Sequence, residues 1–262
     1  AHKHGIPLVV DNTFATPYLF NPIKHGADVV VYSATKALNG HGNVIAGLVL
    51  EGGNFNWDSE KFPQFQEKHY TLRDENDKLR SFAEKFPGFP FTTRIRLNYL
   101  NYLGASISPF DAYLLLLGIE TLSERIQKQV SNTLKVIDYL EKNEHVEWIK
   151  YPSLKTSVYY ELSQKYFPRG TGSVLSFGFL GSLEKIKEFI ETVNIFSYHA
   201  NVGDARSLII NSPRTTHSEL TPDEQNYAKI EPNLIRLSIG LEDPDDLIAD
   251  LDQAFKKVFK EA

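Results

Sequence analysis

The sequence contains no cysteine and no methionine, and none of its apolar runs is long. Without cysteine there is no disulfide framework and no thiol nucleophile, and a metal site would need histidines and carboxylates. The eight histidines show no H-E-x-x-H or similar ligand spacing, so we expect no metal. No apolar run approaches the roughly 20 residues of a membrane-spanning helix. Disulfide-stabilised, thiol-dependent and membrane-spanning classes are therefore excluded.

The sequence also lacks a strong excess of either charge. The formal net charge is -5 and the pI is about 5.9, which gives no electrostatic reason to bind nucleic acid or an anionic membrane. The chain has 262 residues, of which 42% are hydrophobic, so it can bury a full core. We expect a cytoplasmic protein with one large domain or two smaller ones.

Methionine is absent from position 1 as well, where the chain opens on AHKHGIPLVVDNT without a signal-peptide pattern. His4 and Gly5 resemble the end of a helix, with Gly5 in the position after it. A natural protein seldom begins at the end of a helix. We therefore expect this chain to be the C-terminal part of a longer protein.

Three apolar runs predict buried strands, over residues 6–10, 29–32 and 44–50. Their apolar residues are almost continuous, which is typical of a sheet covered on both faces in an α/β protein. Residues 51–80 are polar and aromatic without a clear period, and they predict an irregular insertion. We assign residues 1–115 to the C-terminal portion of a large domain.

A long helix is predicted next, and a different pattern follows it. Ser108 is a good N-cap and Pro109 a good first helical residue, and we expect a bend near Gly118. Later strands are predicted in VEWIKYP, GSVLSFGFLG, LIINSP and NLIRLSIG. Amphipathic helices are predicted in SLEKIKEFIETVN and from Asp243 onward. This mixture predicts a smaller α+β domain, so we assign residues 116–262 to the connecting helix and that domain.

One lysine lies on the connection between two predicted strands. Lys36 follows Ser33 and Thr35, and Asp11 follows an earlier strand. Ligands bind outside the carboxyl ends of strands in open α/β sheets, so Asp11 and Lys36 are candidates for one crevice. Pyridoxal phosphate (PLP) forms a Schiff base with a lysine and pairs its pyridinium nitrogen with a carboxylate. Ser33 and Thr35 carry hydroxyls that could contact its phosphate.

The same residues allow plainer interpretations. Most lysines are solvated surface charges, and Lys36 could be one of them. Asp11 could cap a turn, while Ser33 and Thr35 could cap a short helix. A Schiff-base aldolase that works without PLP would need a buried Lys36 but no carboxylate partner.

Residues 9–50 contain the motifs DNTFATP and YSATK…GH. They strongly resemble the Cys/Met-metabolism family of PLP-dependent enzymes, and the resemblance continues to the C-terminus. It implies a large domain of the aspartate-aminotransferase-like fold (type I), with Lys36 as the Schiff-base lysine. It also implies that Asp11 is the partner of the pyridine nitrogen and that Ser33 and Thr35 contact the phosphate.

Two later segments fit the same resemblance. In NLIRLSIGLED, Arg236 occupies the family position that binds the substrate α-carboxylate, for which a planar fork of donors is suited. Without the resemblance, an outward-facing arginine on a half-buried strand is the simpler interpretation. In HANVGDARSLI, Asn201 lies where several relatives place a serine near that carboxylate. RTTHSEL matches a loop near the family's active site, although His217 is as readily structural.

Within the family, the insertion over residues 51–80 and the segments ANVGDARSLI and PRTTHSEL are similar to the O-acetylhomoserine and O-acetylserine sulfhydrylases. That similarity implies γ-replacement, in which O-acetyl-L-homoserine and sulfide give L-homocysteine and acetate. A cystathionine γ-synthase, a cystathionine lyase and a methionine γ-lyase remain alternatives, as does an inactive fragment or scaffold. The joint presence of Lys36, Asp11 and Arg236 argues against a scaffold.

The resemblance also implies further polypeptide. The family's glycine-containing phosphate loop and the aromatic residue that stacks on the cofactor ring lie upstream of the position of Ala1. The same holds for the Tyr and Arg that a neighbouring subunit contributes. We therefore expect an upstream part of the same protein to complete the site, in a homo-oligomer built as a dimer of dimers. We expect neither a nucleic-acid nor a membrane partner.

Overall fold

The computed structural model describes residues 1–260 and divides the chain into two compact units. The first unit consists of residues 1–13, 21–34 and 45–113, and the second of residues 14–20, 35–44 and 114 onward. The two units are therefore interleaved along the chain. The predicted boundary between residues 115 and 116 concerns the domains of the whole protein and stays a prediction.

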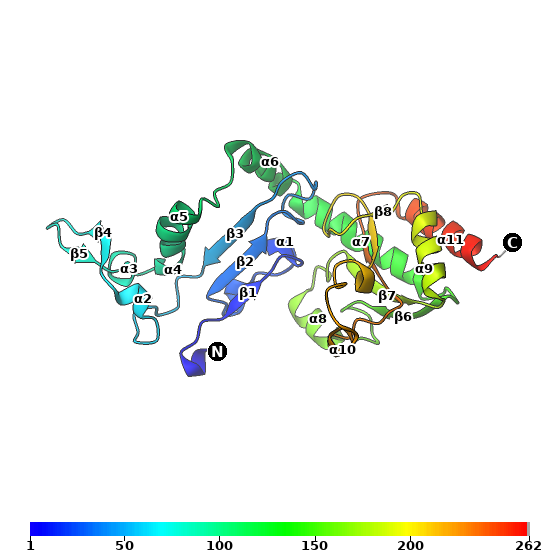
Figure 1. The fold of residues 1–262 in the computed structure, drawn as a ribbon, viewed down its shortest axis with the longest axis horizontal. Helices are drawn as coiled ribbons and strands as arrows, with labels where there is room; N and C mark the ends of the chain where they lie inside the picture. Colours follow the sequence, from blue (N-terminus) through cyan, green and yellow to red (C-terminus); the bar gives the residue numbers. More distant parts are fainter. Residues whose placement is uncertain (261–262) are drawn as a thin grey trace. The chain divides into compact units, whose positions relative to one another are not determined.

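A three-stranded sheet organises the first unit (Figure 1). β1 (Val9–Asp11) pairs in parallel with β2 (Val29–Ser33), which pairs antiparallel with β3 (Gly47–Glu51). Asp11 lies opposite Val31 in the register of β1 and β2. Because the two strands run in parallel, Asp11 and Ser33 both stand at carboxyl ends on the same edge of the sheet.

Only the middle strand of this sheet is as buried as its sequence predicts. Val29 and Val30 of β2 are almost fully buried, whereas 51% of Val9 in β1 and 44% of Leu50 in β3 is exposed. The prediction of buried strands was therefore wrong for β1 and β3. Among residues 1–260, nothing covers these two strands as completely as their apolar composition would require.

Residues 51–80 are not irregular throughout, so that prediction was also wrong in part. They contain α2 (Pro63–Gln66) and a hairpin of β4 (His69–Arg73) and β5 (Leu79–Arg80). Trp57 stacks on Phe91 with ring centroids 4.9 Å apart, inside an aromatic cluster. The hairpin is short and irregular in register, which is why it leaves no period in the sequence.

Several short helices complete the first unit. η1 (His2–His4) is followed by Gly5, whose φ of 61° confirms the helix end predicted there. The others are η2 (Pro22–His25), α3 (Phe82–Lys85), α4 (Pro90–Arg94), η3 (Ile95–Leu100) and α5 (Asn101–Leu103).

The second unit is built on a five-stranded sheet with the order β6-β7-β10-β9-β8 (Figure 1). Neighbouring strands are antiparallel, except that β8 and β9 are parallel. The strands are β6 (Val146–Lys150), β7 (Val174–Phe179), β8 (Ser197–Tyr198), β9 (Leu208–Asn211) and β10 (Leu234–Ser238). The four longer strands confirm the predictions made for this part of the chain.

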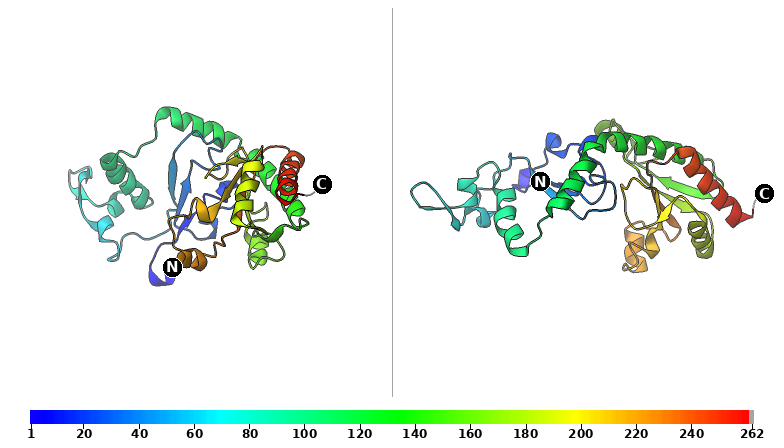
Figure 2. Two further views of the ribbon diagram at one scale, coloured as in Figure 1. Left: turned by 45° about the vertical axis from the view of Figure 1, so that its right-hand side comes forward. Right: turned by 90° about the horizontal axis from the view of Figure 1, so that it is seen from above.

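The second unit also contains several helices. They are α7 (Leu122–Leu140), α8 (Tyr160–Tyr166), α9 (Leu183–Thr192), α10 (Pro222–Tyr227) and α11 (Pro244–Phe259), with α1 (Thr16–Leu19) and η4 (Ser212–Arg214) as short turns. α7, α9 and α11 enclose a core with the sheet (Figure 2). Fully buried Phe177, Phe179, Phe189 and Phe255 lie in it, each stabilising the fold by about 1.5–3 kcal/mol.

Alternation along β10 assigns its side chains to two faces. Ile235 and Leu237 are fully buried in the core that the helices cover. Arg236 lies between them and therefore projects from the opposite face of the sheet. The core thus fixes the strand that carries this predicted site residue.

The predicted long helix is interrupted at Thr121, not at Gly118. α6 (Pro109–Glu120) begins where Ser108 Oγ accepts a hydrogen bond from the Asp111 N–H at 3.0 Å, which confirms the predicted cap. Thr121, with φ −103° and ψ 8°, separates α6 from α7. Gly118 serves close packing instead, because a Cβ there would overlap the backbone of Asn39.

Gly118→Ala should lower the free energy of unfolding by about 2 kcal/mol, because overpacking costs up to about 3 kcal/mol and the helix propensity of alanine returns about 1. Urea denaturation measures this change. Gly88→Ala is the matched control, since nothing lies within 4 Å of a Cβ added there. Equal stabilities of the two variants would mean that the Asn39 backbone simply gives way.

Candidate active site

Lys36 lies in residues 35–44, which belong to the second unit. The segment turns sharply after the lysine, and the Gly40 N–H donates to the Lys36 carbonyl oxygen at 2.8 Å. The Lys36 side chain is half-buried. It therefore starts from a closed turn and not from an extended surface loop.

Lys36, Asn201 and Arg236 come together within the second unit. Lys36 Nζ donates to Asn201 Oδ1 at 2.6 Å, across 165 residues of sequence. Arg236 Nη2 donates to the Asn201 carbonyl oxygen at 3.3 Å. Asn201 is buried and touches both cations, so it is the link between them.

The surroundings of Lys36 change its acidity. Burial lowers the pKa of the Lys36 amine below its usual range, and the nearby positive charge of Arg236 lowers that pKa further. Burial also lowers the pKa of Arg236. A lysine with a lowered pKa has a larger neutral fraction, and only the neutral amine acts as a nucleophile or a base.

The turn over residues 36–40, called the lysine turn below, is held in place by the loop over residues 201–205, which lies between β8 and β9. Ala205 N–H donates to the Gly40 carbonyl oxygen at 2.7 Å, and a Cβ at Gly203 would lie 2.8 Å from the Ala37 backbone. Gly203 has a φ of 70°, and its N–H donates to Ser238 Oγ at 3.0 Å. The loop that carries Asn201 is therefore packed directly onto the turn that carries Lys36.

Asp11 and Ser33 come together in the first unit, at the carboxyl ends of β1 and β2. Asp11 Oδ1 accepts a hydrogen bond from the Thr13 N–H at 2.9 Å. Thr13 Oγ1 in turn accepts one from the Ser33 N–H at 2.8 Å. The hydrogen bond from Thr13 to Asp11 is the capped turn that was the plainer interpretation of Asp11 in the sequence. Thr35 belongs to the second unit, next to Lys36.

His217 was left open between a structural and a functional role. Its ring Nδ1 is 2.9 Å from Thr216 Oγ1, and its N–H donates to the Ser212 carbonyl oxygen. No hydrogen bond joins it to Lys36 or Arg236 in the part of the chain that the structure describes. These contacts favour the structural role.

The comparison with protein families decides the relationship. Residues 1–256 match the model of the Cys/Met metabolism PLP-dependent enzymes. The chain belongs to that family. Its fold is that of PLP-dependent fold type I enzymes, as predicted. Lys36 agrees with this family, because PLP binds covalently to a lysine.

Two curated relatives are similar to almost the whole of this chain. It is 43% identical to "O-acetyl-L-homoserine sulfhydrylase" of Leptospira meyeri over 98% of this chain and 59% of the relative. It is 41% identical to "Homocysteine synthase" of Schizosaccharomyces pombe over 98% of this chain and 59% of the relative. The chain thus spans about three fifths of the length of the curated relatives it matches.

A solved structure is also similar to almost the whole of this chain. An O-acetylhomoserine (thiol)-lyase from Campylobacter jejuni matches with a TM-score of 0.89 and 37% identity. The match covers 98% of this chain and 60% of that one, and that structure carries pyridoxyl-lysine monophosphate. The half-buried amine of Lys36, with its lowered pKa, suits a covalent bond to an aldehyde cofactor. The residues present therefore fit PLP.

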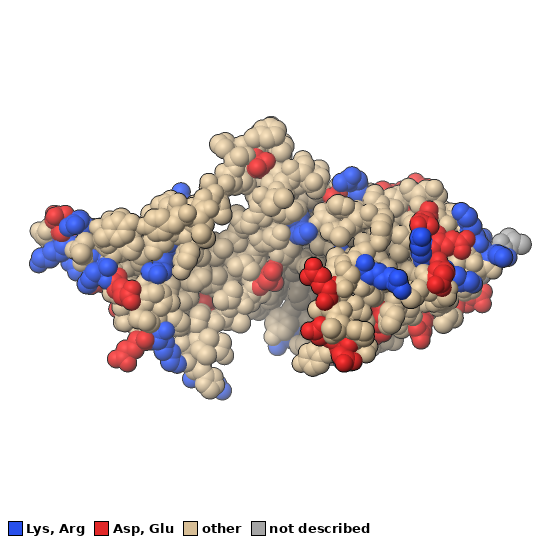
Figure 3. All heavy atoms as spheres, in the orientation of Figure 1, with Lys and Arg blue, Asp and Glu red and all other residues tan. Residues whose placement is uncertain are grey.

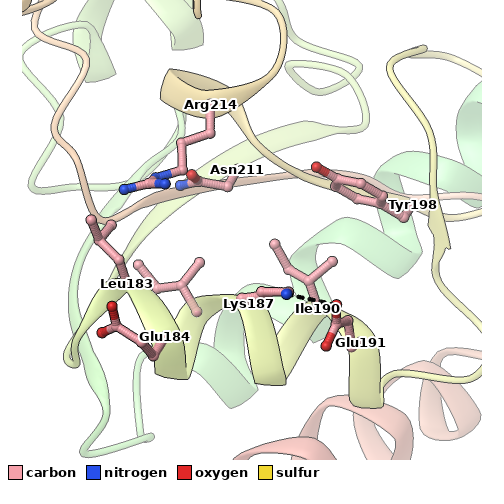
Figure 4. A pocket seen from close by; sticks show the side chains of 9 residues that line it. Leu183, Glu184, Lys187, Ile190, Glu191, Tyr198, Asn211 and Arg214 are labelled. Atoms are coloured by element: carbon pink, nitrogen blue, oxygen red, sulfur yellow. Dashed lines mark ion pairs between the residues drawn. The ribbon is translucent and has the colours of Figure 1, made fainter.

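A separate cavity of about 440 Å³ lies beside α9 (Figure 4). Ile190, Asn211 and Arg214 are among its lining residues. Asn211 pairs with Ile235 and faces the helix side of the sheet, whereas Arg236 projects from the other face. The cavity is therefore not the site of Lys36.

Within residues 1–260, no three His, Asp or Glu side chains are grouped so that they could hold a metal ion. No helix in that same stretch is both long enough and apolar enough to cross a membrane.

The reactivity of Lys36 should reflect its lowered pKa. In cofactor-free protein, competitive acylation with peptide mapping should show Lys36 reaching half-maximal reactivity at a lower pH than the exposed Lys187. Arg236→Gln should move the Lys36 midpoint upward by only part of the difference, because burial is the larger cause and remains. Identical profiles for Lys36 and Lys187 would contradict this account.

Proposed function

We propose that the protein containing this chain catalyses PLP-dependent γ-replacement, in which O-acetyl-L-homoserine and sulfide give L-homocysteine and acetate. The observation that carries this proposal is that Lys36 and Arg236 both donate hydrogen bonds to Asn201, where burial also lowers the pKa of Lys36. The names of the relatives support the choice of substrate. The bond from Cγ to the acetate oxygen breaks and a carbon–sulfur bond forms, so the reaction balances without an oxidant or reductant.

Lys36 has two tasks in this proposal. Its Nζ would hold PLP covalently, and the same amine, when neutral, would accept and return protons at the substrate carbons. PLP, when bound, supplies an electron sink for the negative charge that develops at Cα. The lowered pKa keeps more of the Lys36 amine neutral, and Asn201 Oδ1 orients that amine by accepting its hydrogen bond.

Arg236 binds the substrate α-carboxylate. Arginine remains charged even when burial lowers its pKa, and its planar fork can pair with both carboxylate oxygens. Its hydrogen bond to Asn201 uses Nη2 and leaves the other guanidinium N–H groups for the substrate. Asp11 would pair with the pyridine nitrogen of PLP, and Ser33 and Thr35 would contact its phosphate, as the family resemblance implies.

We also propose that further polypeptide and further subunits complete the enzyme, as a dimer of dimers. The exposed apolar surface of α5 and α6 supports this, since 75% of Leu103, 67% of Phe110 and 60% of Leu116 is exposed. On the face shown in Figure 3, few charged side chains lie over these two helices, whereas both signs are interspersed over α9 and α11. Such apolar surfaces commonly mark interfaces.

Borohydride reduction tests the cofactor assignment, and a product assay tests the reaction. Purified protein supplied with PLP should yield a PLP-sized adduct on Lys36, and it should form homocysteine only when sulfide is present. Lys36→Ala should abolish both, while Lys187→Ala, at an exposed position, should retain both. Dominant release of keto acid would indicate a lyase instead, and turnover by Lys36→Ala would remove Lys36 from the chemistry.

Arg236→Ala should raise the KM for O-acetyl-L-homoserine, because the substrate carboxylate loses its charged partner. The expected loss is about 2–5 kcal/mol of binding free energy, the range for a buried hydrogen-bonded charge pair. Steady-state kinetics measure it. Arg214→Ala is the matched control, since Arg214 is exposed beside α9. An unchanged KM would make Arg236 an ordinary outward-facing arginine.

A further inference from the structure

Arg125 is a buried cation without an acidic partner. It lies on α7, only 4% of it is exposed, and burial lowers its pKa. Among residues 1–260 it forms no ion pair with an aspartate or a glutamate. Burying a charge without a counter-charge opposes folding unless its donors are all well bonded. The partners of those donors therefore show why an arginine is placed there.

Its donors converge on one short stretch of backbone. Arg125 Nη1 donates to the Ala37 carbonyl oxygen at 2.9 Å, and Nη2 donates to that of Leu38 at 3.3 Å. Nη2 also donates to the Gly118 carbonyl oxygen at 2.5 Å, and Nε to Thr121 Oγ1 at 3.1 Å. Ala37 and Leu38 directly follow Lys36. The guanidinium thus binds the lysine turn to the junction of α6 and α7.

The turn is shaped around this guanidinium. Gly40 has a φ of 74°, and a Cβ there would overlap the Arg125 guanidinium. The Gly40 N–H closes the turn on the Lys36 carbonyl oxygen. The side chain of Arg125 therefore occupies the space that a larger residue at position 40 would take.

The same helix also holds the partner of Lys36. Gln129, one turn after Arg125, is fully buried and donates to the Asp204 carbonyl oxygen at 2.7 Å. Asp204 lies three residues after Asn201, which accepts the hydrogen bond from Lys36. α7 therefore carries both the residue that anchors the lysine turn and the residue that anchors the Asn201 loop.

We infer that Arg125 is a positioning residue for Lys36, whose fork of donors fixes the turn after the lysine and so aims Nζ at Asn201. This rests on the proposed function only where it takes Lys36 as the cofactor-binding lysine. Geometry and not charge is the property required. Lysine at position 125 would keep the charge, but it has no planar fork to reach Ala37, Leu38 and Thr121 together.

Borohydride labelling of the purified protein supplied with PLP tests this inference, with the Lys36 adduct measured relative to adducts on exposed lysines. Arg125→Gln and Arg125→Lys should each reduce labelling of Lys36 by about tenfold or more, because small misplacements of reacting groups cost large factors. Asn132→Ala is the matched control on α7. Asn132 is buried and donates to Gly240 and Glu242, not to the lysine turn, so labelling should stay within about twofold of wild type.

The outcomes separate the two proposals. Wild-type labelling of Lys36 in both Arg125 variants would overturn the positioning role, and wild-type labelling in Arg125→Lys alone would show that charge is what counts. If even the wild type does not label at Lys36, the proposed function fails instead. Hydrogen exchange of the Gly40 amide then decides about Arg125, since it should be about tenfold faster in Arg125→Gln than in Asn132→Ala.

A milder variant covers the case in which neither Arg125 variant folds. Thr121→Val removes one acceptor of the guanidinium and leaves the others. It should reduce Lys36 labelling by about two- to fivefold, in line with the loss of one hydrogen bond. Unchanged labelling in a folded Thr121→Val protein would overturn the inference.

Discussion

The hydrogen bond from Lys36 to Asn201 depends on a turn whose backbone is held from several directions. Arg125 binds its carbonyl oxygens, Gly203 packs against it, and Ala205 bonds to its far end. These contacts need close approach of backbone to backbone or to a flat guanidinium. Positions 40 and 203 must therefore be glycine. The chemistry assigned to Lys36 depends on this constraint, because the fixed turn places the amine within hydrogen-bond distance of Asn201.

Lys36 and Arg236 both bind Asn201, and the repulsion between their charges would be unfavourable if both were fixed. The repulsion is reduced at Lys36, because lysine loses its proton more easily than arginine does. Burial and the charge of Arg236 both lower the pKa of Lys36, whereas an arginine stays protonated. Asn201 contributes a neutral oxygen to each cation and so avoids a carboxylate, which would raise the pKa of the lysine again.

Much of the second unit could be predicted from the sequence, because its apolar periods are strong. β10 and α11 follow from alternation and from the Asp243 cap, and both were found where the pattern placed them. The exposure of β1 could not be predicted, since burial depends on what covers a strand and not on the strand's composition.

The site shows a similar division. Lys36, Asp11 and Arg236 stood out by residue type and by resemblance to a family. Arg125 did not, because three of its four acceptors are backbone carbonyl oxygens, the farthest 88 residues away, and a backbone acceptor leaves no signature in the sequence. The same holds for Gly203, whose requirement for a small residue arises from a neighbour distant in the chain.

The span of 165 residues between Lys36 and Asn201 has a consequence for biosynthesis. A ribosome makes the N-terminal side first, so Lys36 leaves the exit tunnel long before Asn201 and Arg236 exist. During that interval the nascent chain has neither the neighbouring arginine nor the burial that alter the amine. Lys36 acquires both influences only after Asn201 and Arg236 have been synthesised. The order of residues along the chain therefore delays the lowering of the Lys36 pKa until the strand that carries Arg236 has been made.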